Sequence, residues 1–220
     1  MTDHRPHQYV PALRYDVLTP FYDVIAATLL REQTLKEHLI AQAQTNPGTR
    51  ALDVGCGTGT LALLAKHTLP TTTFVGIDGD WSILRKARAK PENHDNPVAW
   101  HCGTVDALPY ADATFDIVFS SLLFHHLTYQ MKLQAFREIL RLLRPGGQMY
   151  LGDWGPPPNL MMRLLFVPVQ LLDGFLTTQD NVRGVLPLLM EEVGFTAVHK
   201  TAAFATPLGM LTCYTGQKPH

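Results

Sequence analysis

The chain has 220 residues, of which 46% are hydrophobic, and its 18 Lys and Arg nearly balance its 19 Asp and Glu. This length and apolar content suffice for one large core and exclude disorder over most of the chain. The formal net charge of -1 argues against a nucleic-acid binder that works by bulk positive charge. We expect one domain, residues 1–220, whose function must be read from local sites.

The spacing of the cysteines and the composition of the first ten residues bear on the cellular location of the protein. Cys56, Cys102 and Cys213 are widely spaced and form no C-x-x-C pair, which favours a reduced, intracellular setting. Residues 1–10 lack the apolar segment of a secretory signal. No apolar run reaches the ~18 residues that span a bilayer, and the nearest one, 160–176, is interrupted by polar residues. The sequence predicts a cytoplasmic protein without a transmembrane segment.

Short apolar runs alternate with longer helical patterns in the centre of the chain, which is typical of βαβ units and a mostly parallel sheet. Residues 15–41 come first and read as two helices divided near 30–34. Five strands are then expected, at 50–55, 73–78, 98–102, 115–121 and 147–152. Helices are expected between them, at 60–68, 81–90 and 129–143, the last stopped by the turn Arg144-Pro145-Gly146-Gly147.

The C-terminal part follows a different pattern. A rigid turn at 153–158 precedes the apolar stretch 160–176, and a helix is expected at 185–193. Two last strands, at 196–204 and 209–217, are close enough to form a hairpin, so the sheet should end in an antiparallel edge. The predicted fold class is α/β, a doubly wound, seven-stranded, mostly parallel sheet with an antiparallel C-terminal edge and helices on both faces.

The most informative segment is Asp53-Val-Gly-Cys-Gly-Thr-Gly59, at the carboxyl end of the first strand. Glycines there allow a sharp turn and a close approach of a ligand to the backbone, although a tight turn without a ligand is the alternative. The G-x-G-x-G spacing and the charge of Asp53 disfavour a nicotinamide-dependent oxidoreductase and suit a cationic ligand. Asp78 ends the second strand, where a carboxylate can accept from two ribose hydroxyls; the alternative role is a helix cap, for which Asp80 is better placed.

These motifs resemble those of the class I S-adenosylmethionine-dependent methyltransferases, in particular the subgroup of ubiquinone and menaquinone biosynthesis methyltransferases. The resemblance is carried by Asp53, Gly55, Gly57 and Gly59, by Asp78, and by the segments 103–109, 115–127 and 141–147. It implies a Rossmann-like fold and S-adenosylmethionine as cofactor. It also implies a division into a helical lid (1–48), a cofactor-binding core (49–152), a substrate-covering insert (153–194) and C-terminal strands (195–220).

The resemblance implies a set of cofactor-binding residues, which are Asp53, Gly55, Cys56, Gly57, Thr58, Gly59, Asp78, Gly79, Thr104, Val105, Asp106, Ser120 and Tyr22. Thr104 stands where the subgroup usually has an acidic residue, but its hydroxyl can still accept a hydrogen bond. Cys56 reads as a small filler between glycines and not as a nucleophile. Tyr15 and Tyr22 lie in the predicted lid, where Tyr22 can equally be a core aromatic residue.

Three residues are candidates for catalysis. His125 and His126 follow the fourth strand, where a histidine of near-neutral pKa could accept a proton from the acceptor. Adjacent side chains diverge, so we expect at most one to face substrate, and both could instead bind backbone at a helix start. Asp153 follows the fifth strand and could orient substrate or merely cap a turn. No third ligand stands nearby in the sequence, so no metal is expected.

The apolar stretch 160–176 bears on the acceptor. The simplest interpretation is that it packs as part of a core or a lid. The alternatives are an apolar substrate pocket or contact with a membrane surface. The predicted function is transfer of a methyl group from S-adenosylmethionine to a small, apolar molecule. A non-catalytic S-adenosylmethionine-binding module, or a partner subunit, is the alternative. The sequence indicates no oligomeric state.

Overall fold

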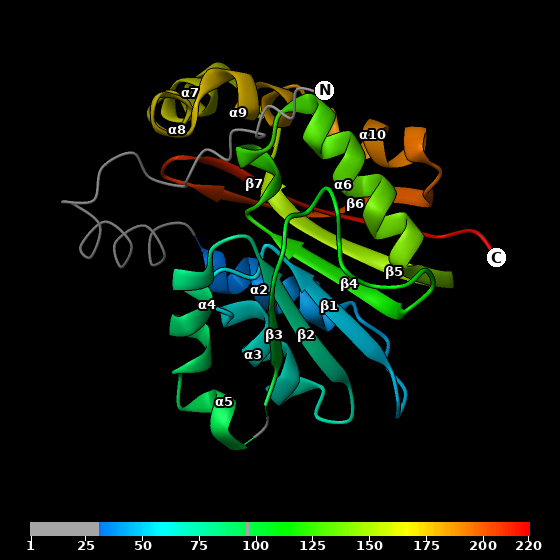
Figure 1. Cartoon of the computed structure of the whole chain (residues 1–220). Coiled ribbons are helices and arrows are strands. Elements are labelled where there is room, and N and C mark those ends of the chain that lie inside the picture. Colours follow the sequence, from blue (N-terminus) through cyan, green and yellow to red (C-terminus); the bar gives the residue numbers. More distant parts are fainter. Residues whose placement is uncertain (1–30, 96) are drawn as a thin grey trace, which may run out of the picture.

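The computed structural model describes residues 31–95 and 97–220, which form a seven-stranded sheet with helices on both faces (Figure 1). Its strands lie in the order β3-β2-β1-β4-β5-β7-β6. The first five run parallel, and β7 runs antiparallel to both β5 and β6. The strands are β1 (Arg50–Val54), β2 (Thr73–Asp78), β3 (Ala99–Cys102), β4 (Phe115–Ser121), β5 (Leu143–Trp154), β6 (Thr196–Thr206) and β7 (Gly209–Gln217). The predicted fold class is confirmed.

The helices follow the predicted periodicity in the core of the chain. They are α2 (Glu32–Ala41), α3 (Thr60–Thr68), α4 (Trp81–Arg88), α5 (Glu92–Asp95), the 3-10 helix η1 (Phe124–His126), α6 (Tyr129–Leu142), α7 (Leu160–Leu165), α8 (Val167–Asp173), α9 (Phe175–Val182) and α10 (Leu186–Val193). Asp80 caps α4 as predicted, because its carboxylate accepts from the Ser82 amide at 2.7 Å. Tyr15, Tyr22 and the first of the two predicted N-terminal helices lie outside the described residues.

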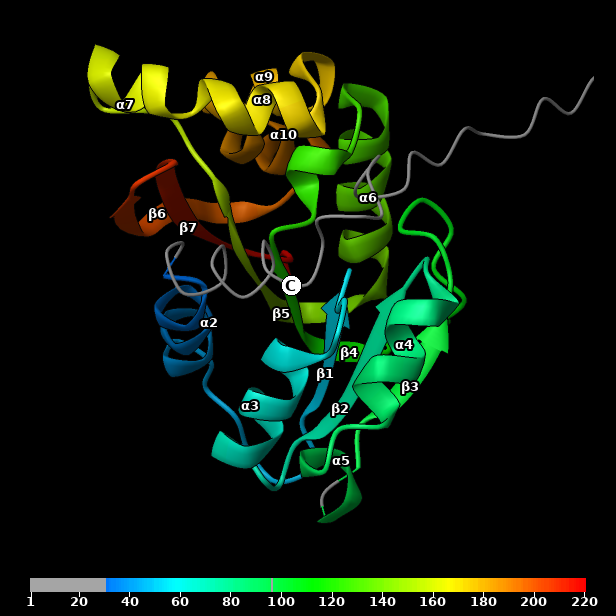
Figure 2. The same ribbon diagram turned by 90° about the vertical axis from the view of Figure 1, so that its left-hand side faces the viewer.

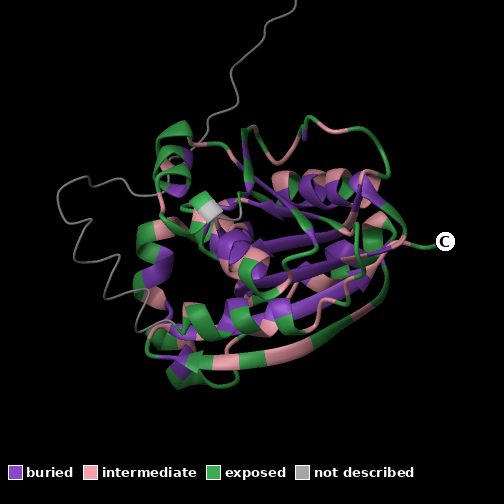
Figure 3. Cartoon of the chain, turned by 90° about the horizontal axis from the view of Figure 1, so that it is seen from below, coloured by how far each residue is buried: buried purple, intermediate pink, exposed green. Residues whose placement is uncertain are grey.

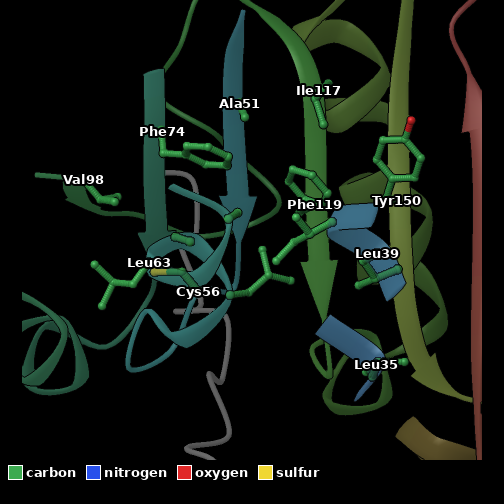
Figure 4. Close-up of a cluster of buried hydrophobic side chains, with 14 of the residues drawn as sticks. Leu35, Leu39, Ala51, Cys56, Leu63, Phe74, Val98, Ile117, Phe119 and Tyr150 are labelled. Carbon is green, nitrogen blue, oxygen red and sulfur yellow. The ribbon is translucent and has the colours of Figure 1, made fainter. Parts of the chain in front are cut away.

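Both faces of the central strands are buried, which explains their nearly continuous apolar runs (Figure 3). Alternate residues face opposite layers: Ala51 and Phe119 pack with α2 and α3, whereas Leu52 and Val118 pack with α6 and α10. On the α2 side, Phe119 stacks on Tyr150 with ring centroids 5.5 Å apart (Figure 4). The sheet is therefore held rigid between two cores, and its carboxyl edge is a firm platform.

The turn expected at Arg144-Pro145-Gly146-Gly147 is instead the beginning of β5. The helix before it does end, at Leu142, but Leu143 already pairs with Phe115 across a register shift in β4. Gly146 has a φ of 79°, and its amide donates to the Lys218 carbonyl at 3.0 Å. Pro145 and Gly146 fit here because strand pairing is irregular at this point. A residue without a backbone N–H and a residue with a positive φ therefore do not interrupt a regular ladder.

The apolar stretch 160–176, for which a packed core or lid was expected, is only partly buried. It forms α7, α8 and the start of α9, which gather at one end of the molecule (Figure 2). Only the inner side is buried, through Met162, Phe166 and Val169. The outer side is an apolar face made of Leu160, Met161, Leu164, Leu165, Leu171, Leu172, Phe175 and Leu176. The sequence identified this stretch as apolar but predicted neither its division into helices nor what covers its outer side.

Among the described residues, no helix is long and apolar enough to cross a membrane.

Gly76 in β2 marks a close contact beneath the glycine loop. A Cβ at this position would lie 2.5 Å from the Trp100 ring and 3.1 Å from the Cys56 sulfur. The indole is held in place, because its Nε1 donates to Asn93 at 3.2 Å. A methyl group at residue 76 therefore has no flexible neighbour to displace.

We expect Gly76→Ala to lower the free energy of unfolding by about 1–3 kcal/mol, since it overpacks this contact. Urea unfolding followed by circular dichroism measures the change. Trp100→Phe supplies the matched background, in which the smaller ring should relieve the overlap. An equal cost of Gly76→Ala in both backgrounds would show that the indole is not the cause.

Candidate functional site

The glycine loop connects β1 to α3 and turns through three left-handed glycines. Gly55, Gly57 and Gly59 have φ angles of 70°, 52° and 75°. The amides of Gly55 and Cys56 donate to the Ile77 carbonyl at 2.9 and 3.1 Å, which ties the loop to the end of β2. An added Cβ at Gly57 would meet no atom within 4 Å. Bare backbone at Gly57 thus borders open space, as close binding of a ligand requires.

The outer two glycines are needed for packing. A Cβ at Gly59 would lie 2.3 Å from the Trp100 ring, and one at Gly55 would lie 2.7 Å from Leu123. Leu123 immediately precedes η1, which carries both predicted catalytic histidines. The loop and the histidine segment are therefore in direct contact, which sequence separation alone did not reveal.

Asp78 joins the glycine loop to the next strand end. Its Oδ2 accepts from the Gly57 amide at 2.9 Å, and its Oδ1 accepts from the Asp80 amide at 2.9 Å. Each carboxylate oxygen has a second lone pair, so hydroxyl groups of a ligand can still donate to it. The exposed Gly79 follows directly and accepts from the Cys102 thiol at 3.8 Å. The structure thus gathers Gly57, Asp78 and Gly79 at one edge of the sheet.

Asp53 is a buried acid in β1. The residue is 1% exposed, and neither carboxylate oxygen has a hydrogen-bond partner among the described residues. Burial raises the pKa of Asp53 to about 7; the Lys36 charge opposes this shift and the Asp78 charge adds to it. An unpartnered buried carboxylate is costly in the folded protein. A cationic ligand group nearby would stabilise its ionised form.

The remaining predicted cofactor residues differ in accessibility. Thr58 and Thr104 are exposed, and Val105 and Asp106 are half-buried. The last three follow β3, whose final residue pairs with Asp78, so they lie beyond the same edge of the sheet.

Three further predicted positions are less available to a ligand or lie outside the described residues. Ser120 is fully buried, and its hydroxyl donates to the Val54 carbonyl at 2.9 Å, which links β4 to β1. The Cys56 thiol is buried, and burial raises its pKa, in keeping with a filler and not a nucleophile. Tyr22 lies outside the described residues.

The structure places His125 against Asp153. The Nδ1 of His125 lies 2.8 Å from Oδ1 of Asp153, and both residues are buried. A carboxylate can only accept, so Nδ1 carries the hydrogen and the lone pair of the neutral ring is on Nε2. Two of the three predicted catalytic residues therefore form one hydrogen-bonded pair.

Asp153 is held by several donors besides His125. The Phe124 and Trp154 amides each donate at 2.7 Å, to Oδ2 and Oδ1 respectively. The Asn181 side chain donates to Oδ1 at 3.0 Å and to the Trp154 carbonyl at 3.1 Å. Asn181 belongs to α9 and was not predicted, because an isolated asparagine in a helix gives no signal in the sequence.

The charges of this cluster decide which histidine can carry a proton. Burial would lower the pKa of His125, but the charge and hydrogen bond of Asp153 and the charge of Asp173 outweigh it, and the net shift is upward. Burial would raise the pKa of Asp153, but its pairing with His125 lowers it. The neighbouring His125 charge, followed by burial, lowers the pKa of His126 to about 3. His126 is thus neutral near pH 7.

The two histidine rings do not diverge as expected. Their centroids are 4.0 Å apart, because the tight turn of η1 brings both to one side. Asp173 at the end of α8 approaches them, with its Oδ2 3.8 Å from Nε2 of His125. The sequence offers no third ligand near the histidines, but the structure brings Asp173 to them from a helix more than forty residues later.

A buried lysine fixes the helices that carry these groups. Lys132 of α6 is fully buried, and its Nζ donates to the Thr177 carbonyl at 2.5 Å and to Oδ2 of Asp180 at 3.1 Å. Both partners belong to α9, which also carries Asn181. The position of α9 over η1 is therefore set by a buried ion pair as well as by the Asp153 network.

Known methyltransferases are similar in sequence to this chain. A family model described as a methyltransferase domain matches residues 51–147. The ubiquinone/menaquinone biosynthesis C-methyltransferase UbiE of Geobacter sulfurreducens is 26% identical over 224 residues, covering 91% of this chain and 85% of that protein. The 27-O-demethylrifamycin SV methyltransferase of Amycolatopsis mediterranei is 32% identical over 136 residues, covering 61% of this chain. The chain spans only 49% of that second relative's length.

A solved structure shares the fold. Phosphoethanolamine N-methyltransferase 2 of Haemonchus contortus, in complex with phosphomonomethylethanolamine and S-adenosylhomocysteine, superposes with a TM-score of 0.71 at 15% identity. The match covers 93% of this chain and 58% of that chain. The sequence motifs, the fold and the named relatives agree, and together they support a class I S-adenosylmethionine-dependent methyltransferase with S-adenosylmethionine as its cofactor.

Proposed function

We propose that this methyltransferase acts on a small, apolar molecule that it binds at the carboxyl edge of the sheet, bordered by the His125–Asp153 pair and the α7–α9 segment. The observation that carries the proposal is the buried His125–Asp153 pair, which lies at the carboxyl edge of the sheet beside the glycine loop. Ligands of open α/β sheets bind at this edge. The named methyltransferase relatives do not favour the alternative of a non-catalytic binding module.

The chain's own residues fit the cofactor. The bare backbone at Gly57 gives access to the loop, and Asp78 has acceptor capacity left for ribose hydroxyls. Asp53 offers an unpaired carboxylate near the cationic end of such a ligand. Thr104, Val105 and Asp106 are proposed to border the adenine. When bound, S-adenosylmethionine supplies an electrophilic methyl group on a sulfonium.

His125 is proposed to accept a proton from the acceptor molecule. Its Nδ1 hydrogen is held by Asp153, so Nε2 has a lone pair directed away from that carboxylate. The upward shift of the His125 pKa makes this nitrogen a stronger base than an ordinary imidazole. Asp153 is proposed to position the ring and to stabilise it once protonated. His126 stays neutral and could contact the acceptor without taking its proton.

The nature of the acceptor is inferred from the outer side of the α7–α9 segment, whose inner side contacts this pair through Asn181. The apolar face of α7–α9 leaves Leu160 73% and Leu176 89% exposed. Exposed apolar area of this extent is typical of a surface that binds an apolar partner. Relatives named for ubiquinone, menaquinone and demethylrifamycin support an apolar organic acceptor. Residues 153–194 are accordingly proposed to cover the substrate.

We expect the chain to convert S-adenosylmethionine to S-adenosylhomocysteine in step with methylation of a phenol or quinol. Product analysis by mass spectrometry across a library of phenols, quinols, amines and thiols identifies the acceptor class. Asp78→Ala should weaken cofactor binding about tenfold or more, because a charge-assisted hydrogen bond to the ribose is lost. Calorimetry that detects no cofactor binding to the wild type would contradict the proposal.

Asp53→Asn should alter both stability and cofactor binding with pH. The folded carboxyl keeps its proton to about pH 7, and the unfolded one releases it near 3.8, so wild-type stability falls as pH rises through this window. Because asparagine does not titrate, the free energy of unfolding of the variant, relative to that of the wild type, should increase by roughly 2–3 kcal/mol between pH 5 and 7.

Cofactor affinity of the wild type should rise with pH through about 7, as Asp53 ionises, and that rise should disappear in Asp53→Asn. Urea unfolding and calorimetry at each pH measure the two effects. The exposed Glu191→Gln is the matched control and should change neither profile. Parallel pH profiles for Asp53→Asn and the wild type would refute this role of Asp53.

His125→Ala should lower kcat/KM for a hydroxyl acceptor about 10²–10⁴-fold with little change in cofactor affinity, because it removes the base. In the wild type, kcat/KM should rise with pH as His125 loses its proton, at a pH above 6.5. Asp173→Asn should move this rise to lower pH, since it removes a charge that favours the protonated ring. The exposed His94→Ala is the control, and an unchanged profile in His125→Ala would exclude this base.

A further inference from the structure

We propose that His125, His126 and Asp173 form a binding site for a divalent transition-metal ion of the zinc type. One possible ligand atom from each residue can be chosen so that all three lie within 4.8 Å of one another. The proposed methyl transfer does not need this ion. The inference therefore goes beyond that function and is tested independently of it.

His125 has the orientation expected of a metal ligand. Metal-binding histidines usually donate their second ring nitrogen to a carboxylate, which fixes the ring and its tautomer. Asp153 provides this support, with its oxygen 2.8 Å from Nδ1. The free Nε2 faces Asp173, whose Oδ2 lies 3.8 Å away. Asp153 is itself held by the Phe124 and Trp154 amides and by Asn181, so the support is rigid.

The other two groups are free to coordinate. Among the described residues, neither the His126 ring nor the Asp173 carboxylate forms a side-chain hydrogen bond, apart from the approach of Asp173 to His125. Both residues are half-buried, so an ion can reach them from solvent. A metal ion with bonds of about 2.0–2.2 Å places tetrahedral ligand atoms roughly 3.4 Å apart. The 3.8 Å between His125 and Asp173 requires only a small approach.

The donor set selects the class of ion. Two imidazoles and one carboxylate suit zinc and iron(II), whereas magnesium and calcium prefer an all-oxygen shell. Three protein ligands leave at least one coordination position open, as in catalytic zinc sites.

The surrounding charges favour a cation. Asp153 from β5 and Asp173 from α8 face the cluster, and Lys132 from α6 is the nearby cation. The Lys132 charge is engaged by Asp180 of α9 at 3.1 Å, so it is largely neutralised. With both histidines neutral, the cluster therefore carries an excess of negative charge. The ion and a proton would compete for Nε2 of His125.

The experiment uses the full chain, freed of metal by a chelator and without cofactor or acceptor. Calorimetry with Zn²⁺ should detect one equivalent bound, and Co²⁺ should give the visible absorption of a low-coordinate nitrogen and oxygen site. His126→Ala and Asp173→Asn should each weaken Zn²⁺ binding at least tenfold. Asp153→Asn should weaken it about 10–100-fold through the support of His125.

Two controls separate this site from other histidines. His4→Ala/His7→Ala removes the N-terminal pair, and His94→Ala removes an exposed one; both should bind Zn²⁺ as the wild type does. Circular dichroism and cofactor binding report whether each variant is folded. If His126→Ala does not fold, His126→Gln takes its place. Absence of Zn²⁺ binding, or equal affinity in the wild type, His126→Gln and Asp173→Asn, overturns the proposal. Methyl transfer is tested separately on the metal-free protein, in which Nε2 of His125 is open, so neither result affects that test.

Discussion

The buried carboxylate of Asp153 connects three segments that are far apart in the sequence. It lies one residue before the end of β5, accepts from the Phe124 amide of η1 and from the Asn181 side chain of α9, and orients His125. A buried charge is tolerated only where donors surround it, so these segments cannot separate without exposing an unpaired carboxylate. The position of η1 therefore depends on this group, and that of α9 depends on it together with the Lys132–Asp180 ion pair.

Asp53 and Asp153 show how differently one residue type can behave at the same edge of the sheet. Asp153 is surrounded by donors and paired with His125, and its pKa is lowered. Asp53 is buried without a hydrogen-bond partner among the described residues, and its pKa rises to about 7. Asp153 is therefore committed to the architecture, whereas Asp53 is the acid proposed above to meet a cationic ligand group. Such unrelieved burial is typical of functional positions.

The same network explains why the α7–α9 segment can expose so much apolar surface and remain in place. Its hold on the domain comes from the Lys132–Asp180 ion pair, the Asn181–Asp153 hydrogen bond and the inward Phe166. Because these contacts use its inner side, the outer apolar face is left open. A polar anchor combined with an apolar outer face suits an element that borders a hydrophobic molecule.

The sheet, the glycine loop and the resemblance to a methyltransferase family could be predicted from the sequence, because each leaves a pattern in neighbouring residues. Short apolar runs that alternate with helical patterns predicted β1 to β5. Residues 55, 57 and 59 are glycines because their backbone angles are left-handed and, at 55 and 59, because a side chain would overlap its neighbours. The antiparallel hairpin at the end followed from one short connection. The helix before β5 ended where proline and glycine predicted, although the strand began four residues earlier than expected.

The contacts between polar side chains could be found only in the tertiary structure. Asn181, Asp173 and Lys132 lie in or against helices whose periodicity reports an apolar side but not a partner. Nothing in the sequence places Asp173 beside His125, or turns both histidine rings to one side. Hydrophobic spacing likewise could not tell a covered helix from an exposed one, because burial depends on what packs against it. The sequence determined the local backbone, and long-range packing decided the chemistry at its edge.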